Sequence, residues 1–149
     1  MKIALGADHA GYALKEKLAG LLCRLDHEVL DLGAHEPDPG DDYVDYAVAV
    51  ARSVAASDAK RGIVLCGSGV GVTIAANKIA GIRACVCHDA YSARQGVEHD
   101  DMNVLVLGAR VVGPALAEDL ATVFLCAKFN ADERHKRRLR KVKLLDDTR

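Results

Sequence analysis

Short apolar runs alternate with segments of helical periodicity along this chain, and this alternation constrains the fold more than any other feature. Each run ends in glycine or is followed by glycine or a polar turn, as is typical of strands buried in a sheet. The runs lie at 2–6, 28–32, 62–66, 84–87 and 104–107. The alternation predicts an α/β fold, a Rossmann-like three-layer sandwich with a five-stranded parallel sheet covered on both faces.

The expected helices carry apolar residues at the spacing of one helix face. The first stripe consists of Leu14, Leu18, Leu21, Leu22 and Leu25. Similar stripes predict helices over 44–55, over 72–79 and after Pro114, which is a suitable first helical residue. A last helix at about 131–146 carries a basic run. No helical stripe is assigned between 88 and 103.

The size and composition of the chain exclude several classes of protein. A length of 149 residues argues for one domain spanning 1–149, and 50% hydrophobic residues suffice for a core. The longest uncharged run, 62–77, is shorter than the ~18 residues of a membrane-spanning segment. Asp8 comes too early for a signal peptide, and five cysteines without framework spacing suit a reducing compartment. We therefore expect a cytoplasmic protein with no membrane contact.

A basic run near the C-terminus allows two interpretations. Residues 134–143 hold seven Lys and Arg and no acid, whereas the whole chain has 20 Lys and Arg against 21 Asp and Glu. As a nucleic-acid element the helix would be an electrostatic stripe, but it contains no aromatic residue to stack on bases. As a small-ligand clamp, Arg134 and Arg138 lie on one helix face, spaced to grip one phosphate. The clamp is preferred, and nucleic-acid binding is the distant alternative.

The most informative string follows the third predicted strand, at the edge of the sheet where ligands bind in this class of fold. It reads Cys66, Gly67, Ser68, Gly69, Val70 and Gly71. Three alternate glycines allow backbone N–H groups to turn toward an anion, and the helix that follows adds its positive end. The spacing fits neither the dinucleotide fingerprint nor a P-loop. The alternative is a tight turn that needs glycine only for steric reasons.

Four side chains are candidates for chemistry. Cys66 ends a strand just before a helix N-terminus, which favours the reactive thiolate, although most free cysteines are small buried hydrophobes. Asp8 and His9 could bind hydroxyls or a phosphate, or could cap a turn. His99, expected in a loop, could act as an acid or base, or could lie on the surface without a role. The histidines and cysteines lack metal-ligand spacing, so no metal site and no cofactor are predicted.

Several strings together resemble type B ribose-5-phosphate isomerase, in a group that includes galactose-6-phosphate and allose-6-phosphate isomerases. The resemblance runs from residue 2 to about residue 138. The matching strings are GADHAG at 6–11, DY at 42–43, CGSGVG at 66–71, AANK at 75–78, GIRA at 81–84, NVL at 103–105, GARVVG at 108–113 and RHxxR at 134–138.

The resemblance implies a metal-independent aldose–ketose isomerase of sugar phosphates that acts through a cis-enediolate, most simply on ribose 5-phosphate. Cys66 would then move the proton between C1 and C2, and loop 67–71 would stabilise the enediolate oxyanion. Ser68 and His99 would assist ring opening. Sugar hydroxyls would be held by Asp8 and Tyr43, and the phosphate by His9, Arg110, Arg134 and Arg138. Family sites are shared between two subunits, so a homodimer or a dimer of dimers is implied.

One position departs from the family pattern. Relatives commonly have His-Asn-Asp-x-Asn where this chain has His99, Asp100, Asp101, Met102 and Asn103. An acceptor-only carboxylate at Asp100 therefore replaces an amide that donates to the sugar. The preferred substrate accordingly stays open among ribose 5-phosphate, allose or galactose 6-phosphate, and a tetrose phosphate.

Overall fold

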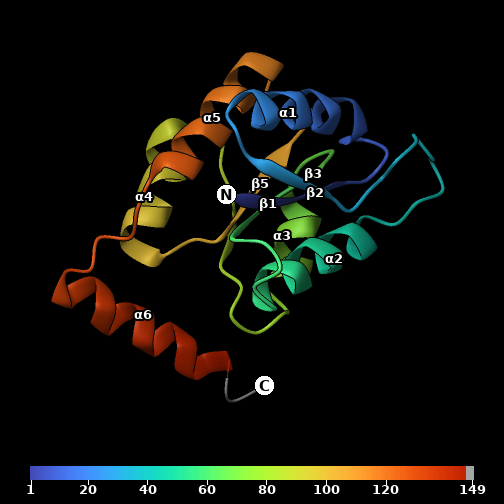
Figure 1. Ribbon diagram of the computed structural model, residues 1–149. Helices are drawn as coiled ribbons and strands as arrows, with labels where there is room; N and C mark the ends of the chain where they lie inside the picture. Colours follow the sequence, from blue (N-terminus) through green and yellow to red (C-terminus); the bar gives the residue numbers. More distant parts are fainter. Residues whose placement is uncertain (147–149) are drawn as a thin grey trace.

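The computed structural model describes residues 1–146, in which strands and helices alternate until the last two helices (Figure 1). The elements are β1 (Lys2–Ala7), α1 (Tyr12–Arg24), β2 (Glu28–Asp31), α2 (Tyr43–Ala55), β3 (Arg61–Cys66), α3 (Val70–Ala76), β4 (Ala84–Val86), α4 (Ala90–Asp100), β5 (Val104–Gly108), α5 (Pro114–Cys126) and α6 (Glu133–Asp146). This order confirms the predicted α/β class.

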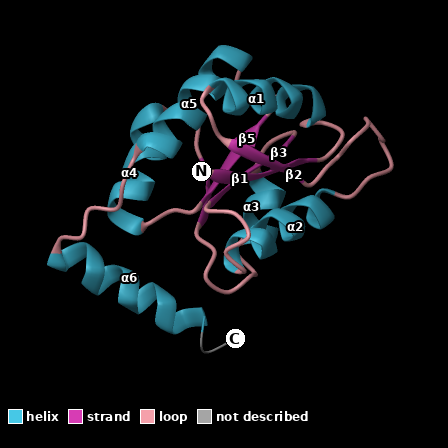
Figure 2. Ribbon diagram, viewed as in Figure 1, coloured by secondary structure: helices cyan, strands magenta, loops and turns pink. Residues whose placement is uncertain are grey.

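The five strands form one parallel sheet in the order β2-β1-β3-β5-β4. Figure 2 shows α1 and α5 on one side of the strands and α2 and α3 on the other. Helices α1, α4 and α5 pack on one face, and α2 and α3 pack on the other. The predicted three-layer sandwich with a five-stranded parallel sheet is therefore confirmed. Because the strands are parallel, the residues that follow β1, β3 and β5 meet at the same edge of the sheet.

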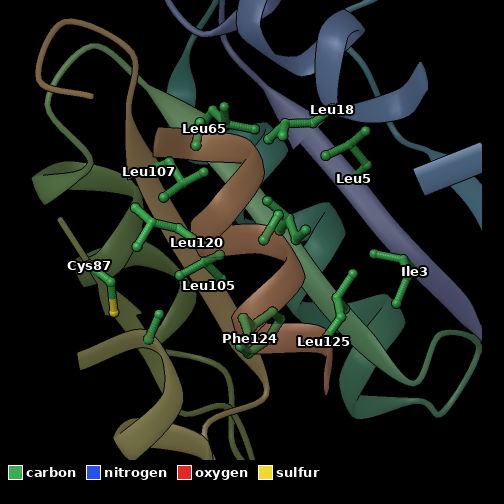
Figure 3. Packing of buried hydrophobic residues seen from close by; sticks show 14 of the residues in the cluster. Ile3, Leu5, Leu18, Leu65, Cys87, Leu105, Leu107, Leu120, Phe124 and Leu125 are labelled. Atoms are coloured by element: carbon green, nitrogen blue, oxygen red, sulfur yellow. The ribbon is translucent and has the colours of Figure 1, made fainter. Parts of the chain in front are cut away.

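Alternate residues of the central strands face two separate hydrophobic cores. In β3, Ile63 and Leu65 point toward α1, α4 and α5, whereas Val64 and Cys66 point toward α2 and α3. Figure 3 shows the first core, in which Leu65 of the sheet and Leu120 of α5 belong to one packed cluster. Burial on both faces explains why these strands are continuously apolar in sequence.

Helix α2 approaches β3 closely at Gly62. A Cβ atom at this position would lie 2.6 Å from Cγ1 of Val50 and 3.2 Å from Cγ2 of Val104, so only glycine fits. At its other end, α2 is capped by Asp42, whose carboxylate accepts a hydrogen bond from the N–H of Val44 at 3.0 Å. The contact at Gly62 and this cap fix the position of Tyr43, the first residue of the helix.

The sequence-based helix predictions miss α4 and misplace α3. His99 lies in the last turn of α4 rather than in a loop. This helix is mostly polar and buries only Ala93 and Val97, so it leaves no clear apolar stripe in the sequence. Helix α3 begins at Val70, directly after Gly69, rather than at residue 72, because the glycine loop turns into the helix without a spacer.

Helix α6 lies away from the sheet and contacts α4, one of the helices that cover it (Figure 1). Near its start, His135 and Leu139 are buried, and at its end Oδ2 of Asp146 accepts a hydrogen bond from the N–H of Gly81 at 2.9 Å. Between these points, the helix lines an open groove of about 510 Å³ against α4 and β4. Within residues 1–146, no helix has both the length and the apolar character that crossing a membrane requires.

Candidate active site

A cavity of about 380 Å³ lies at the edge of the sheet where β1, β3 and β5 end. The predicted site residues that line it are Asp8, His9, Tyr43, Cys66, Gly67, Ser68, Gly71 and Arg110. Gly69 of the same loop and Val70, the first residue of α3, do not line the cavity. Residues far apart in the sequence thus form one site, because three neighbouring parallel strands deliver them to the same edge.

Cys66 is the last residue of β3 and lies at the base of this site. Its side chain is almost fully buried, and its sulfur accepts a hydrogen bond from the N–H of Gly69 at 3.1 Å. Its carbonyl accepts a second bond from the N–H of Ala109 at 2.8 Å, which ties the end of β3 to the end of β5. The sulfur is thus held against the backbone of the glycine loop at the base of the cavity.

The glycine loop is held in shape by its neighbours. Gly69 has φ +84°, and a Cβ there would lie 2.7 Å from Cγ2 of Val86. Gly71 packs under the ring of Tyr43, where a Cβ would lie 2.7 Å from the ring atoms. The hydroxyl of Ser68 accepts a weak hydrogen bond from the N–H of Val70 at 3.3 Å. The glycines therefore serve close backbone packing as well as ligand access, so the steric interpretation of this string also holds.

His9 forms two hydrogen bonds with the carboxylate of Asp41, a residue that was not among the predicted site residues. Asp41 accepts hydrogen bonds from the backbone N–H of His9 at 2.8 Å and, through its other oxygen, from Nδ1 at 2.6 Å. The side chain of Asp41 is 6% exposed and that of His9 is 34% exposed. The pKa of His9 is raised, mainly by the hydrogen bond to Asp41 and further by the negative charges of Asp41 and Asp8. Burial and the positive charge of Arg110 lower this pKa but do not reverse the shift.

Asp8 and Arg110 complete the part of the site that one chain provides. Asp8 is nearly buried, and its Oδ1 accepts a hydrogen bond from the N–H of Gly11 at 2.9 Å, so one oxygen serves the turn while the residue lines the cavity. The backbone N–H of Arg110 donates to the carbonyl of Gly67 at 2.9 Å, which holds its side chain beside the glycine loop. The cavity therefore has the guanidinium of Arg110 and the imidazole of His9, whose pKa is raised, next to one carboxylate.

The other predicted residues gather elsewhere and do not line this cavity. They are His99 and Asp100 at the end of α4, and Arg134 and Arg138 on α6. Helix α4 starts at the carboxyl edge of the sheet and runs back about 16 Å to the amino edge, at 1.5 Å per residue. One chain therefore places these four residues and Cys66 at opposite edges of its sheet.

A pair of stacked histidines organises this second group. The rings of His99 and His135 lie 4.2 Å apart between centroids, at an interplanar angle of 25°. Nε of Arg134 donates to Nε2 of His135 at 3.1 Å, and Nδ1 of His135 lies 3.2 Å from the carbonyl oxygen of Asn130. Because a carbonyl can only accept, His135 carries its proton on Nδ1. The buried His135 thus connects two predicted site residues, although the sequence analysis gave it no role.

Comparisons with known proteins agree with the geometry. Residues 3–142 match the Ribose/Galactose Isomerase family. Ribose-5-phosphate isomerase B of Escherichia coli is 42% identical over 99% of this chain and 98% of its own length. D-erythrulose-4-phosphate isomerase of Pectobacterium atrosepticum is 39% identical over 87% of this chain and 85% of its own length. The structure of ribose-5-phosphate isomerase B from Clostridium thermocellum matches with a TM-score of 0.96 and 44% identity, covering 99% of each chain. This chain therefore belongs to the ribose/galactose isomerase family and is an isomerase.

Proposed function

We propose that this isomerase interconverts ribose 5-phosphate and ribulose 5-phosphate through a cis-enediolate. The observation that carries the proposal is the Cys66 sulfur at the base of the cavity, with the N–H of Gly69 donating to it at 3.1 Å. The relatives from Escherichia coli and Clostridium thermocellum, which bear the name of this activity and match over nearly the full chain, support the choice of substrate.

In the proposed reaction, the Cys66 thiolate takes the proton from C2 of the open-chain aldose. The electrons of that C–H bond form the C1–C2 double bond, and the C1 carbonyl oxygen becomes an oxyanion. Backbone N–H groups of loop 67–71 stabilise this charge. A proton then moves from O2 to O1, and the Cys66 thiol returns its proton to C1, which leaves the ketone at C2. The thiolate is regenerated and no other reactant is consumed.

The charged groups of the cavity support the proposed binding roles. His9 and Arg110 would hold the phosphate, since both can donate hydrogen bonds into the cavity and the raised pKa of His9 favours its cationic form. Asp8 and Tyr43 would hold sugar hydroxyls, and Ser68 would assist ring opening together with His99. The substrate thus bridges a cationic end and the Cys66 sulfur within one cavity.

We infer that a second copy of the chain completes each site, in a homodimer or a dimer of dimers. His99, Asp100, Arg134 and Arg138 lie at the opposite edge of their own sheet, so a single chain cannot bring them to its Cys66. A two-fold interface would exchange these residues reciprocally, giving two equal sites. Exposed apolar side chains beside both groups support this assembly, with Val70 and Ile74 on α3 near the cavity and Val142, Leu144 and Leu145 on α6.

A tetrose phosphate is the second candidate substrate. The relative from Pectobacterium atrosepticum is named for a four-carbon substrate and is nearly as similar as the one from Escherichia coli. The carboxylate of Asp100, where family members commonly present an amide, also alters the group offered to the sugar.

A panel of four-, five- and six-carbon sugar phosphates tests the proposal through kcat/KM. We expect the highest value for ribose 5-phosphate. A higher value for erythrulose 4-phosphate would establish the second candidate, and no turnover of any sugar phosphate would overturn both.

A further inference from the structure

A carboxylate that the reaction does not use lies directly behind His9. Both oxygens of Asp41 accept hydrogen bonds from His9, Oδ2 from its backbone N–H at 2.8 Å and Oδ1 from Nδ1 of its ring at 2.6 Å, and Tyr46 of α2 also interacts with this carboxylate. Asp41 does not line the cavity, whereas His9 does. The contact therefore joins a ligand-facing ring to a carboxylate that is shielded from the ligand.

This two-point contact determines how the ring of His9 is presented. With its backbone and Nδ1 both bound to Asp41, the imidazole cannot rotate without breaking a short hydrogen bond. Nε2 is then the ring nitrogen left to face a ligand, and a carboxylate partner on Nδ1 favours a ring that carries protons on both nitrogens. The arrangement presents a fixed ring nitrogen to the cavity and favours the protonated form of that ring.

The charged groups around His9 favour the same protonation state. Asp41 lies in the segment before α2, Asp8 at the end of β1 and Arg110 after β5. The hydrogen bond to Asp41 is the main cause that raises the pKa of His9, and the negative charges of Asp41 and Asp8 raise it further. Burial and the positive charge of Arg110 lower this pKa but do not reverse the shift. Without the negative charge at residue 41, the pKa of His9 would therefore fall, because the positive charge of Arg110 would be balanced by Asp8 alone.

We propose that Asp41 is a positioning residue of the phosphate subsite, which orients the His9 ring and holds it as the cation that binds the substrate phosphate. This proposal rests on the proposed function for its ligand, and on the two hydrogen bonds for its geometry. Asp41 acts through His9 and does not itself touch the substrate.

Asp41→Asn tests the proposal because it keeps the size of the side chain and removes its charge. Asp38→Asn is the matched control, since Asp38 is an exposed acid of the same loop that bonds Gly40 at 2.8 Å. In Asp41→Asn the His9 cation is lost at a lower pH than in the wild type. We expect the ratio of variant to wild-type KM for ribose 5-phosphate to rise with pH, reaching about two- to tenfold near pH 8, with kcat within about twofold. The control should give a ratio near one at every pH.

A pH-independent KM ratio, or a loss of kcat at unchanged KM, would overturn the role of Asp41. A second measurement does not depend on turnover. The NMR signal of the ring proton on Cε1 of His9, assigned by its absence from His9→Gln, is followed from pH 5 to 9 with and without inorganic phosphate. We expect the His9 pKa to fall in Asp41→Asn and phosphate to raise it in the wild type. Equal pKa values in both proteins, or no response to phosphate, would overturn the proposal. If both responses occur but no sugar phosphate is isomerised, the proposed function fails and the role of Asp41 in anion binding stands.

Discussion

His99 stacks on His135 with 4.2 Å between the ring centroids, and this contact joins α4 to α6. The same His135 accepts a hydrogen bond from Nε of Arg134. One buried ring therefore sets the position of a proposed acid–base group and of a proposed phosphate ligand. The two helices would otherwise carry these residues independently.

This arrangement predicts different effects for two substitutions of His135. His135→Phe keeps an aromatic ring against His99 but cannot accept from Arg134, so we expect a raised KM with kcat within about threefold. His135→Ala also removes the stacking, worth about 0.5–1.5 kcal/mol, and should lower kcat by a further two- to tenfold or so. Steady-state kinetics on proteins of equal thermal stability make the comparison. Identical KM and kcat effects in the two variants would show that the ring contact with His99 does not affect turnover, and an unchanged KM in His135→Phe would show that the hydrogen bond from Arg134 does not affect substrate binding.

Cys66→Ala is expected to abolish isomerisation while substrate binding and folding are retained. A general base contributes about 10²- to 10⁴-fold to rate, and no other thiol lines the described cavity. Turnover and exchange of the substrate C2 proton with solvent should disappear together. Cys126→Ala is the matched control, because this thiol is exposed at the end of α5. If Cys66→Ala kept most of its kcat, another group would have to be the base.

Arg134 and Arg138 should act as a phosphate clamp rather than as part of a general basic surface. A hydrogen bond to a charged group is worth about 1.5–3 kcal/mol, so Arg134→Ala or Arg138→Ala should raise KM roughly 10- to 150-fold. Lys136→Ala and Arg140→Ala, on the same helix, should change KM little. Equal effects at all four positions would favour a diffuse basic surface and call for salt-dependent RNA-binding measurements.

Sharing of sites between copies predicts complementation. Cys66→Ala and Arg134→Ala are each expected to have little activity alone. When they are mixed and allowed to exchange subunits, hybrid dimers regain one intact site, so about a quarter of wild-type activity should return at equal mixing. Sites formed within one chain would give only the sum of the two residual activities.

Asp100→Asn should change the choice of substrate. An amide adds a donor that the carboxylate lacks, and one mismatched hydrogen bond is worth about 1–2 kcal/mol. We expect the ratio of kcat/KM between ribose 5-phosphate and at least one other aldose phosphate to shift roughly five- to thirtyfold. Unchanged ratios across the panel would show that Asp100 does not contact the sugar.

The sequence predicts the sheet well because residues such as Val64 and Leu105 are buried on whichever face they point to, which leaves unbroken apolar runs. It also predicts the residues at one edge, since the rule for parallel sheets gathers strand ends. It does not predict α4, whose burial depends on two small apolar side chains. Asp41 could not be distinguished from the nearby Asp38 and Asp42, because only the folded loop brings it to His9. His135 was missed for the same reason, as its partner is 36 positions away.

The close contact between Gly62 and Val50 links the packing of α2 in the core to the shape of the cavity. Because Gly62 has no side chain, the middle of α2 packs directly against β3. The first residue of the helix is Tyr43, whose ring lies over Gly71. A larger residue at position 62 would push the helix outward and lift that ring from the glycine loop. Packing deep in the sandwich thus sets the position of a ring that lines the cavity, so a change far from the cavity would alter its shape.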